Sequence, residues 1–198
     1  MSSLLIAWFV SMMTIVVPPE AVSKYAQPGH AETVEQVRAR YHSIASDLVS
    51  VVFDPAETTP YGQGFVGRLR TGALVLAVAT MESGFARDVD VGPCYRGPNN
   101  QGGRCDAGRS ACLLQIQVGI GNTKEGWSRA DLTKDRKKCF KAGLRMMRQS
   151  ISSCRKNPAL HGLAAYASGT CSRGLKESEA RMKLAERLFG TPGRPKEQ

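Results

Sequence analysis

One acidic residue, Glu82, directly follows nine largely apolar residues, ALVLAVATM (73–81). Together with Arg68 to Thr71, this run predicts a helix buried in the core, with Gly84 placed to end it. Burial removes water from a carboxylate, and the partial negative charge of a helix C-terminus repels it. Both effects favour a carboxyl that keeps its proton near neutral pH, as a general acid requires. The alternative is a solvated Glu82 that turns outward at the helix end.

Two further short segments follow Glu82 in the chain. The three segments are ESGF (82–85), LLQI (113–116) and AYASG (165–169). In this order they resemble motifs of the soluble, SLT-type lytic transglycosylases of the lysozyme-like superfamily. In that family a Glu-Ser pair ends a buried helix, a Gly-Leu-Met-Gln segment lines the groove, and an Ala-Tyr-Asn-Ala-Gly segment follows a later helix. The resemblance covers residues 67–170, about half of the chain.

The resemblance implies a mainly α fold, a lysozyme-like bundle around a buried central helix. The glycines, prolines, charged residues and cysteines of 86–111 add a long, disulfide-pinned irregular insertion to it. It implies that Glu82 is the single catalytic acid and later acts as the base. Gln115 would hydrogen-bond the sugar or its N-acetyl group, and the Tyr166 hydroxyl would contact Glu82 or the substrate. The substrate-binding residues implied are Ser83, Gln115, Ile116, Tyr166 and Ser168.

The reaction implied by the resemblance is cleavage of the bond between N-acetylmuramic acid and N-acetylglucosamine in peptidoglycan. The muramyl 6-hydroxyl then attacks its own ring and leaves a 1,6-anhydro product. The family needs no metal or cofactor for this reaction. The expected partner is therefore the peptidoglycan glycan strand, bound by a monomer.

Three positions depart from the family pattern. Cys112 stands where the family has glycine, Ala167 replaces the asparagine, and Ser168 replaces the alanine after it. The stretch between Glu82 and Gln115 is also longer than usual. These departures leave open a second function, a catalytically inactive module that binds cell-wall glycan.

A second carboxylate decides between transglycosylation and hydrolysis. Asp88 and Asp90 follow Glu82 closely, and either one opposite the scissile bond would allow a base-activated water to attack, as in a lysozyme. The favoured interpretation is that both are solvated or paired with Arg87 or Arg96.

The spacing of apolar residues predicts the remaining elements. Thr33 with Gln36, and Ser128 with Asp131, have the spacing of capping boxes at helix starts. The helices expected are 34–51, 128 to about 154, 158–168 and 174–189, with a linker at 18–31, an irregular loop at 86–111 and a short apolar element at 112–118.

The six cysteines all lie in the C-terminal half and lack the spacing of a zinc site. An even number of cysteines without metal spacing favours disulfides and an oxidising compartment. Of the fifteen pairings that six cysteines allow, the favoured one is Cys94–Cys105, Cys154–Cys171 and therefore Cys112–Cys139. Six reduced thiols in a cytosolic protein are the alternative.

The N-terminal segment has the pattern of a targeting sequence. Residues 4–17 match the apolar core of a signal peptide, although no Lys or Arg precedes them. Residues 1–31 are therefore expected to be a cleaved signal peptide or an N-terminal anchor plus linker, the anchor giving membrane attachment through 4–17. Residues 32–190 would form the catalytic domain and 191–198 a flexible tail, in a periplasmic or extracellular protein.

The formal net charge of +10 favours anionic partners, either cell wall or nucleic acid. A nucleic-acid-binding protein is the third hypothesis, and the export-like start, the cysteines and the absence of a nucleic-acid-binding motif argue against specific binding. A basic stripe of solvated side chains is expected on one helix, comprising Arg136, Lys137, Lys138, Lys141, Arg145 and Arg148.

Overall fold

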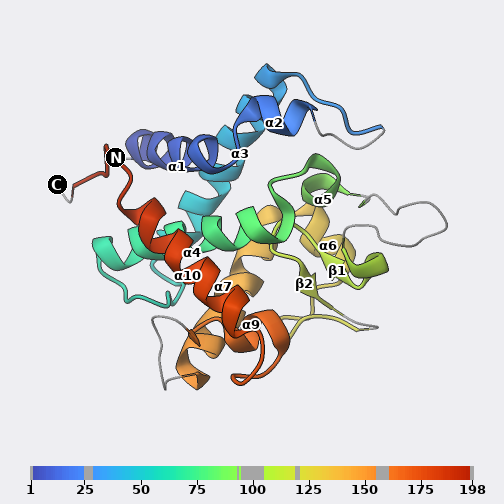
Figure 1. The fold of residues 1–198 in the computed structure, drawn as a ribbon, viewed down its shortest axis with the longest axis vertical. Coiled ribbons are helices and arrows are strands. Elements are labelled where there is room, and N and C mark those ends of the chain that lie inside the picture. Colours follow the sequence, from blue (N-terminus) through green and yellow to red (C-terminus); the bar gives the residue numbers. More distant parts are fainter. Residues whose placement is uncertain are drawn as a thin grey trace.

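The computed structural model describes residues 2–24, 29–92, 94, 105–118, 121–154 and 161–196. The fold is mainly helical, with one two-stranded sheet in the described part of the chain (Figure 1). The elements are α1 (Ser2–Val16), α2 (Pro19–Lys24), α3 (Val34–Val52), α4 (Phe65–Ser83), α5 (Arg87–Val91), the 3-10 turn η2 (Asp106–Gly108), β1 (Ser110–Ala111), β2 (Ile116–Gln117), α6 (Arg129–Lys134), α7 (Arg136–Ser153), α9 (Ala164–Ser168) and α10 (Leu175–Phe189).

Helix α4 is the buried centre of the fold, and α1, α3, α7 and α10 all contact it. Residues 73–79 of its apolar run are buried on every side, as the sequence predicts, whereas Met81 at the end of the run is exposed. Gly84 ends the helix in the left-handed conformation, φ 55°, and its amide donates back to the carbonyls of Ala79 and Thr80. The expected glycine terminator is confirmed, and it leaves Glu82 in the last turn of the helix.

Helix α1 packs with one face against α3 and α4 (Figure 1). Phe9 meets α4 at Gly72, where a Cβ would lie 2.2 Å from the ring. The Trp8 indole donates to the Thr191 carbonyl at 3.3 Å, and the Tyr41 hydroxyl donates to the Val17 carbonyl at 2.8 Å. The buried side chains of α1 are Leu5, Trp8, Phe9, Met12 and Met13. The assignment of residues 1–31 to a signal peptide or anchor stays a prediction.

Two segments at the chain ends differ in detail from the sequence-based expectation. Residues 18–31, expected to be a linker, contain the short helix α2. In the expected flexible tail, the Thr191 carbonyl is an acceptor and Arg194 lies 4.6 Å from the Phe189 ring centre. Among the helices that the structure describes, none is long and apolar enough to cross a membrane.

The helix expected from Ser128 to about Cys154 is two helices, α6 and α7. Asp135 has extended backbone, with φ −131° and ψ 99°, and its side chain caps the amides of Lys137 and Lys138. The capping side chain stabilises a new helix start and so breaks the chain direction. The capping boxes at Thr33 and Ser128 are confirmed.

The expected loop 86–111 contains regular structure where it is described. Residues 87–91 form α5, residues 106–108 form η2, and residues 110–111 pair with 116–117 as an antiparallel ladder. The first part of the expected helix 158–168 lies outside the described residues, and its end at Gly169 is confirmed. Helix α10 ends at Gly190 as expected.

The cysteines form the three disulfides that the sequence favours, Cys94–Cys105, Cys112–Cys139 and Cys154–Cys171. Disulfides persist in oxidising surroundings, so the pairing is consistent with an extracellular or periplasmic protein. The mainly helical class and the disulfides near the irregular segment are therefore confirmed.

Candidate functional site

A pocket with a volume of about 470 Å³ opens beside the C-terminal end of α4. It gathers side chains from segments far apart in sequence: the end of α4, η2, the turn before β2 and β2 itself, α7, α9 and α10. The lining residues are Glu82, Cys105, Asp106, Gln115, Gln117, Met146, Tyr166, Ala167, Ser168, Gly169 and Arg181. Glu82, Gln115, Tyr166 and Ser168, all predicted from sequence, therefore share one cavity.

Glu82 is paired with a cation from a distant helix. The Arg181 Nη2 donates to Glu82 Oε1 at 2.6 Å. The side chain of Glu82 is 19% exposed and that of Arg181 is 9% exposed. Glu82 thus faces the pocket from a largely desolvated position, as a general acid requires, but with a guanidinium against it. The sequence-based argument for a protonated carboxyl did not include this partner.

The Tyr166 side chain lines the pocket and joins α9 to the segment before β2. Its hydroxyl donates to the Leu114 carbonyl at 2.6 Å, and not to Glu82. Burial and the nearby charge of Glu82 raise the pKa of Tyr166 far above its usual value, although Arg181 opposes the shift. Tyr166 is therefore a neutral hydrogen-bond donor.

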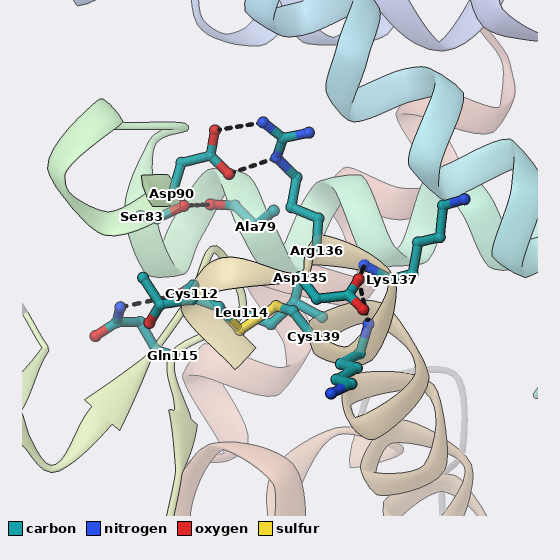
Figure 2. The surroundings of a disulfide bond; sticks show 12 residues. Ala79, Ser83, Asp90, Cys112, Leu114, Gln115, Asp135, Arg136, Lys137 and Cys139 are labelled. Carbon is teal, nitrogen blue, oxygen red and sulfur yellow. Dashed lines mark hydrogen bonds and ion pairs between the residues drawn. A yellow bond between two sulfur atoms is a disulfide. The ribbon is translucent and has the colours of Figure 1, made fainter. Parts of the chain in front are cut away.

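Gln115 reaches the pocket from a turn with unusual backbone angles. Cys112 and Gln115 have φ of 59° and 49°, a left-handed region that favours glycine. A glycine at position 112 would adopt this conformation without strain. Here the disulfide to Cys139 on α7 holds the turn, and the Gln115 side-chain amide donates to the Cys112 carbonyl (Figure 2). Strained backbone of this kind is concentrated at functional sites.

Two of the predicted binding residues do not line the pocket. Ser83 is buried, and its hydroxyl donates to the Ala79 carbonyl and accepts from the Phe85 amide (Figure 2). Ile116 is 1% exposed and belongs to the core. Their side chains support the end of α4 and the sheet. Ser168 does line the pocket, and its hydroxyl donates to the Ala164 and Thr170 carbonyls.

The expectation that Asp88 and Asp90 are solvated is wrong, and Asp90 pairs with other arginines than the expected Arg87 or Arg96, whereas a pairing of Asp88 with either of these stays a prediction. Both are buried, and Asp90 accepts from Arg136 at 2.6 Å and lies 3.5 Å from Arg40 (Figure 2). Burial beside an arginine is the more stable arrangement because a desolvated carboxylate needs a counter-charge. Arg96 lies outside the described residues.

The ion-pair cluster of Asp90, Arg40 and Arg136 fixes the chain just after Glu82. Arg40 donates to the Phe85 carbonyl at 2.8 Å and forms a two-point ion pair with Glu32. Arg136 joins Asp90 to Asp47 on α3. These contacts tie α3, α5 and α7 to the corner that follows Glu82, so the cluster positions the acid without lining its pocket.

The basic stripe expected on α7 is largely paired with acids. Arg136 contacts Asp47 and Asp90, Lys141 contacts Asp54 and Glu57, and Arg145 contacts Glu125. Lys138 contacts Asp131 and lies 5.9 Å from the Trp127 ring centre. Within the described residues, no group of three His, Cys, Asp or Glu side chains is arranged to hold a metal ion.

Sequence reasoning missed two charged residues of the pocket. Arg181 lies on α10, 99 residues after Glu82, in a helix where an arginine is unremarkable. Asp106 lies in the irregular segment and accepts a hydrogen bond from the Ser110 hydroxyl. The spacing of these two residues matches no motif that would have marked Asp106 in the sequence. The nearest available signal for Arg181 was its helical spacing from Met182, Ala185 and Leu188, which places it close to the buried face.

Comparison of the chain with protein-family models, with curated proteins and with solved structures found no match in any of the three.

Proposed function

We propose that this protein is a lysozyme-like lytic transglycosylase that cleaves the glycan strands of peptidoglycan, with Glu82 as its acid. The observation that carries the proposal is the meeting of the three motif segments in one pocket. Glu82, Gln115, Tyr166 and Ser168 come from three places in the chain and line the same cavity. A mostly polar cavity suits a sugar, and the charge of +10 suits an anionic polymer.

The proposed reaction uses one carboxyl group twice. Glu82 donates its proton to the bridging oxygen, and the bond from that oxygen to the muramyl C1 breaks with its electron pair on the oxygen. The muramyl 6-hydroxyl oxygen then bonds to C1 and passes its proton to the Glu82 carboxylate. The acid is regenerated, and the product carries a 1,6-anhydro ring.

A second candidate function, hydrolysis, rests on Asp106. This carboxylate lines the pocket with Glu82, whereas Asp88 and Asp90 do not. A base in this position would activate a water for attack at C1, which leaves a reducing end in place of the anhydro ring. The chemistry of the new end therefore separates the two reactions.

The third candidate is a module that binds glycan without cutting it. The observation that favours it is the ion pair between Glu82 and Arg181, because a carboxylate held against a cation is a poor proton donor. Such a module would bind peptidoglycan in the same pocket and release no products.

The test is mass spectrometry of soluble products from purified peptidoglycan treated with the oxidised protein and with E82Q. We expect 1,6-anhydromuropeptides from the wild type and at least about a hundredfold fewer from E82Q, since the general acid is lost. The matched control is E186Q, the same change at an exposed glutamate of α10 that pairs with Arg70. It should cut like the wild type.

The other outcomes select the other candidates. Reducing-end products that disappear in both E82Q and D106N identify a hydrolase. A folded wild type that pellets with peptidoglycan and releases no products contradicts the enzyme and supports the binding module.

A further inference from the structure

Arg181 is held at one end only. Its Nη2 donates to Glu82, whereas Nε and Nη1 are buried and have no hydrogen-bond partner in the described protein. Buried donors without acceptors are uncommon in folded proteins, and each one calls for an explanation. A side chain tethered through a single nitrogen changes its acceptor by breaking a single contact.

Glu82 and Arg181 form an ion pair inside the pocket. Arg181 is the only cation among the described residues that line the cavity, and Glu82 is its only anionic partner there. If Glu82 took up a proton, a guanidinium that is 9% exposed would lose its counter-charge. The other titratable groups facing the cavity are Asp106 from η2 and Tyr166 from α9, and Tyr166 is neutral.

We propose that Arg181 is a positioning residue that keeps Glu82 ionised in the empty pocket and releases it when glycan binds. An acyl carbonyl oxygen of the bound strand replaces Glu82 Oε1 as the acceptor of the guanidinium. Glu82 then takes one proton from solvent and becomes the acid that the bridging oxygen needs. The inference rests on the proposed function, and it makes substrate binding a condition for forming the acid.

The test compares the pH dependence of kcat/KM, which reports the free enzyme, with that of kcat, which reports the enzyme–substrate complex. The substrate is soluble, uncrosslinked peptidoglycan strands. In the wild type the alkaline limb of kcat should lie above that of kcat/KM. In R181Q the two limbs should coincide at the higher pH.

Two further variants keep the test decisive. R181K retains a cation and should keep the limbs apart, even if R181Q fails to fold. R70Q removes the other arginine pair between α4 and α10, an exposed one, and should leave both limbs unchanged. If Arg181 were merely structural, replacing it would lower stability and rate without changing how far apart the two limbs lie.

If turnover depends on Glu82 but the alkaline limbs of kcat and kcat/KM coincide in the wild type, the proposed role of Arg181 is overturned and the proposed function stands. Turnover that is absent, or equal in the wild type and E82Q, would overturn the proposed function and this inference with it.

Discussion

Tyr166 shows how a single hydroxyl shapes the pocket. Its hydrogen bond to the Leu114 carbonyl joins α9 to the turn that carries Gln115. Leu114 is fully buried, so this carbonyl depends on protein donors. The bond therefore fixes the distance between two walls of the cavity.

Replacing Tyr166 by Phe should lower the free energy of unfolding by about 1–3 kcal/mol, because the buried carbonyl loses its donor. Urea denaturation measures the change. Burial raises the pKa of Tyr166 in the folded protein. The hydroxyl therefore stabilises the fold fully below the unfolded tyrosine value of about 10, and this stabilisation declines as pH rises above it.

The control for Tyr166 is Tyr61, whose hydroxyl donates to the Met182 sulfur at 4.0 Å and whose pKa burial raises to about 12. Y61F should cost less than Y166F because a sulfur acceptor is weak. Equal losses in the two variants would contradict a special role for the bond to Leu114.

At this scale, prediction from sequence succeeds where the signal is local. Glu82 and Gly84 stand out because an acid and a glycine follow an apolar run. Arg181 and Asp106 do not, because their place in the pocket depends on how α10 and η2 pack against α4 and β2. Ser83 belongs to the motif by position, yet its hydroxyl serves the helix end.

Among the elements, α1 approaches α4 closely at Gly72. A Cβ at this position would overlap the Phe9 ring, which is itself fully buried. The missing side chain is what lets the two helices lie against each other. Overpacking at such a contact forces side chains off their rotamers or moves the backbone.

Replacing Gly72 by Ala should lower the free energy of unfolding by about 1–3 kcal/mol, despite the better helix propensity of alanine. Thermal melting followed by circular dichroism measures it. Gly121 is the matched control, since nothing lies within 4 Å of a Cβ there. An unchanged melting temperature in G72A would mean that α1 does not pack on α4 as described.

Elements are predictable from sequence where periodicity and caps agree. Helix α3 has both, and α4 and α10 each end at a glycine that the sequence marks, so the ends of all three are close to those expected. The break between α6 and α7 was missed because good helix formers stand on both sides of Asp135. Periodicity alone does not reveal a capping aspartate inside such a run.

The whole molecule is stabilised in two different ways. Helices α1, α3, α4 and α10 pack through apolar side chains, and none of them carries a cysteine. The segments on the pocket side are cross-linked: Cys105 precedes η2, Cys112 holds the turn before Gln115, and Cys171 follows α9. The pocket wall therefore depends on covalent bonds more than the helical core does.

Reduction should loosen the pocket wall before the core. Each lost disulfide costs about 2–4 kcal/mol for loops of this length, and the cost falls on the segments that it constrains. Hydrogen exchange in reduced and alkylated protein should rise first in residues 105–118, and later in α3 and α4. The oxidised protein at the same pH is the reference. A uniform rise along the chain would indicate one cooperative unit.

The position of α1 also bears on how the folded state is reached. Phe9, Met12 and Met13 are buried in the core, and they belong to the same apolar run that has the pattern of a targeting segment. These side chains cannot contact lipid or a translocation channel while they contact α3 and α4. Membrane insertion and completion of the core are therefore mutually exclusive states of one segment. If the segment were inserted in a bilayer, the faces of α3 and α4 that contact α1 would be uncovered.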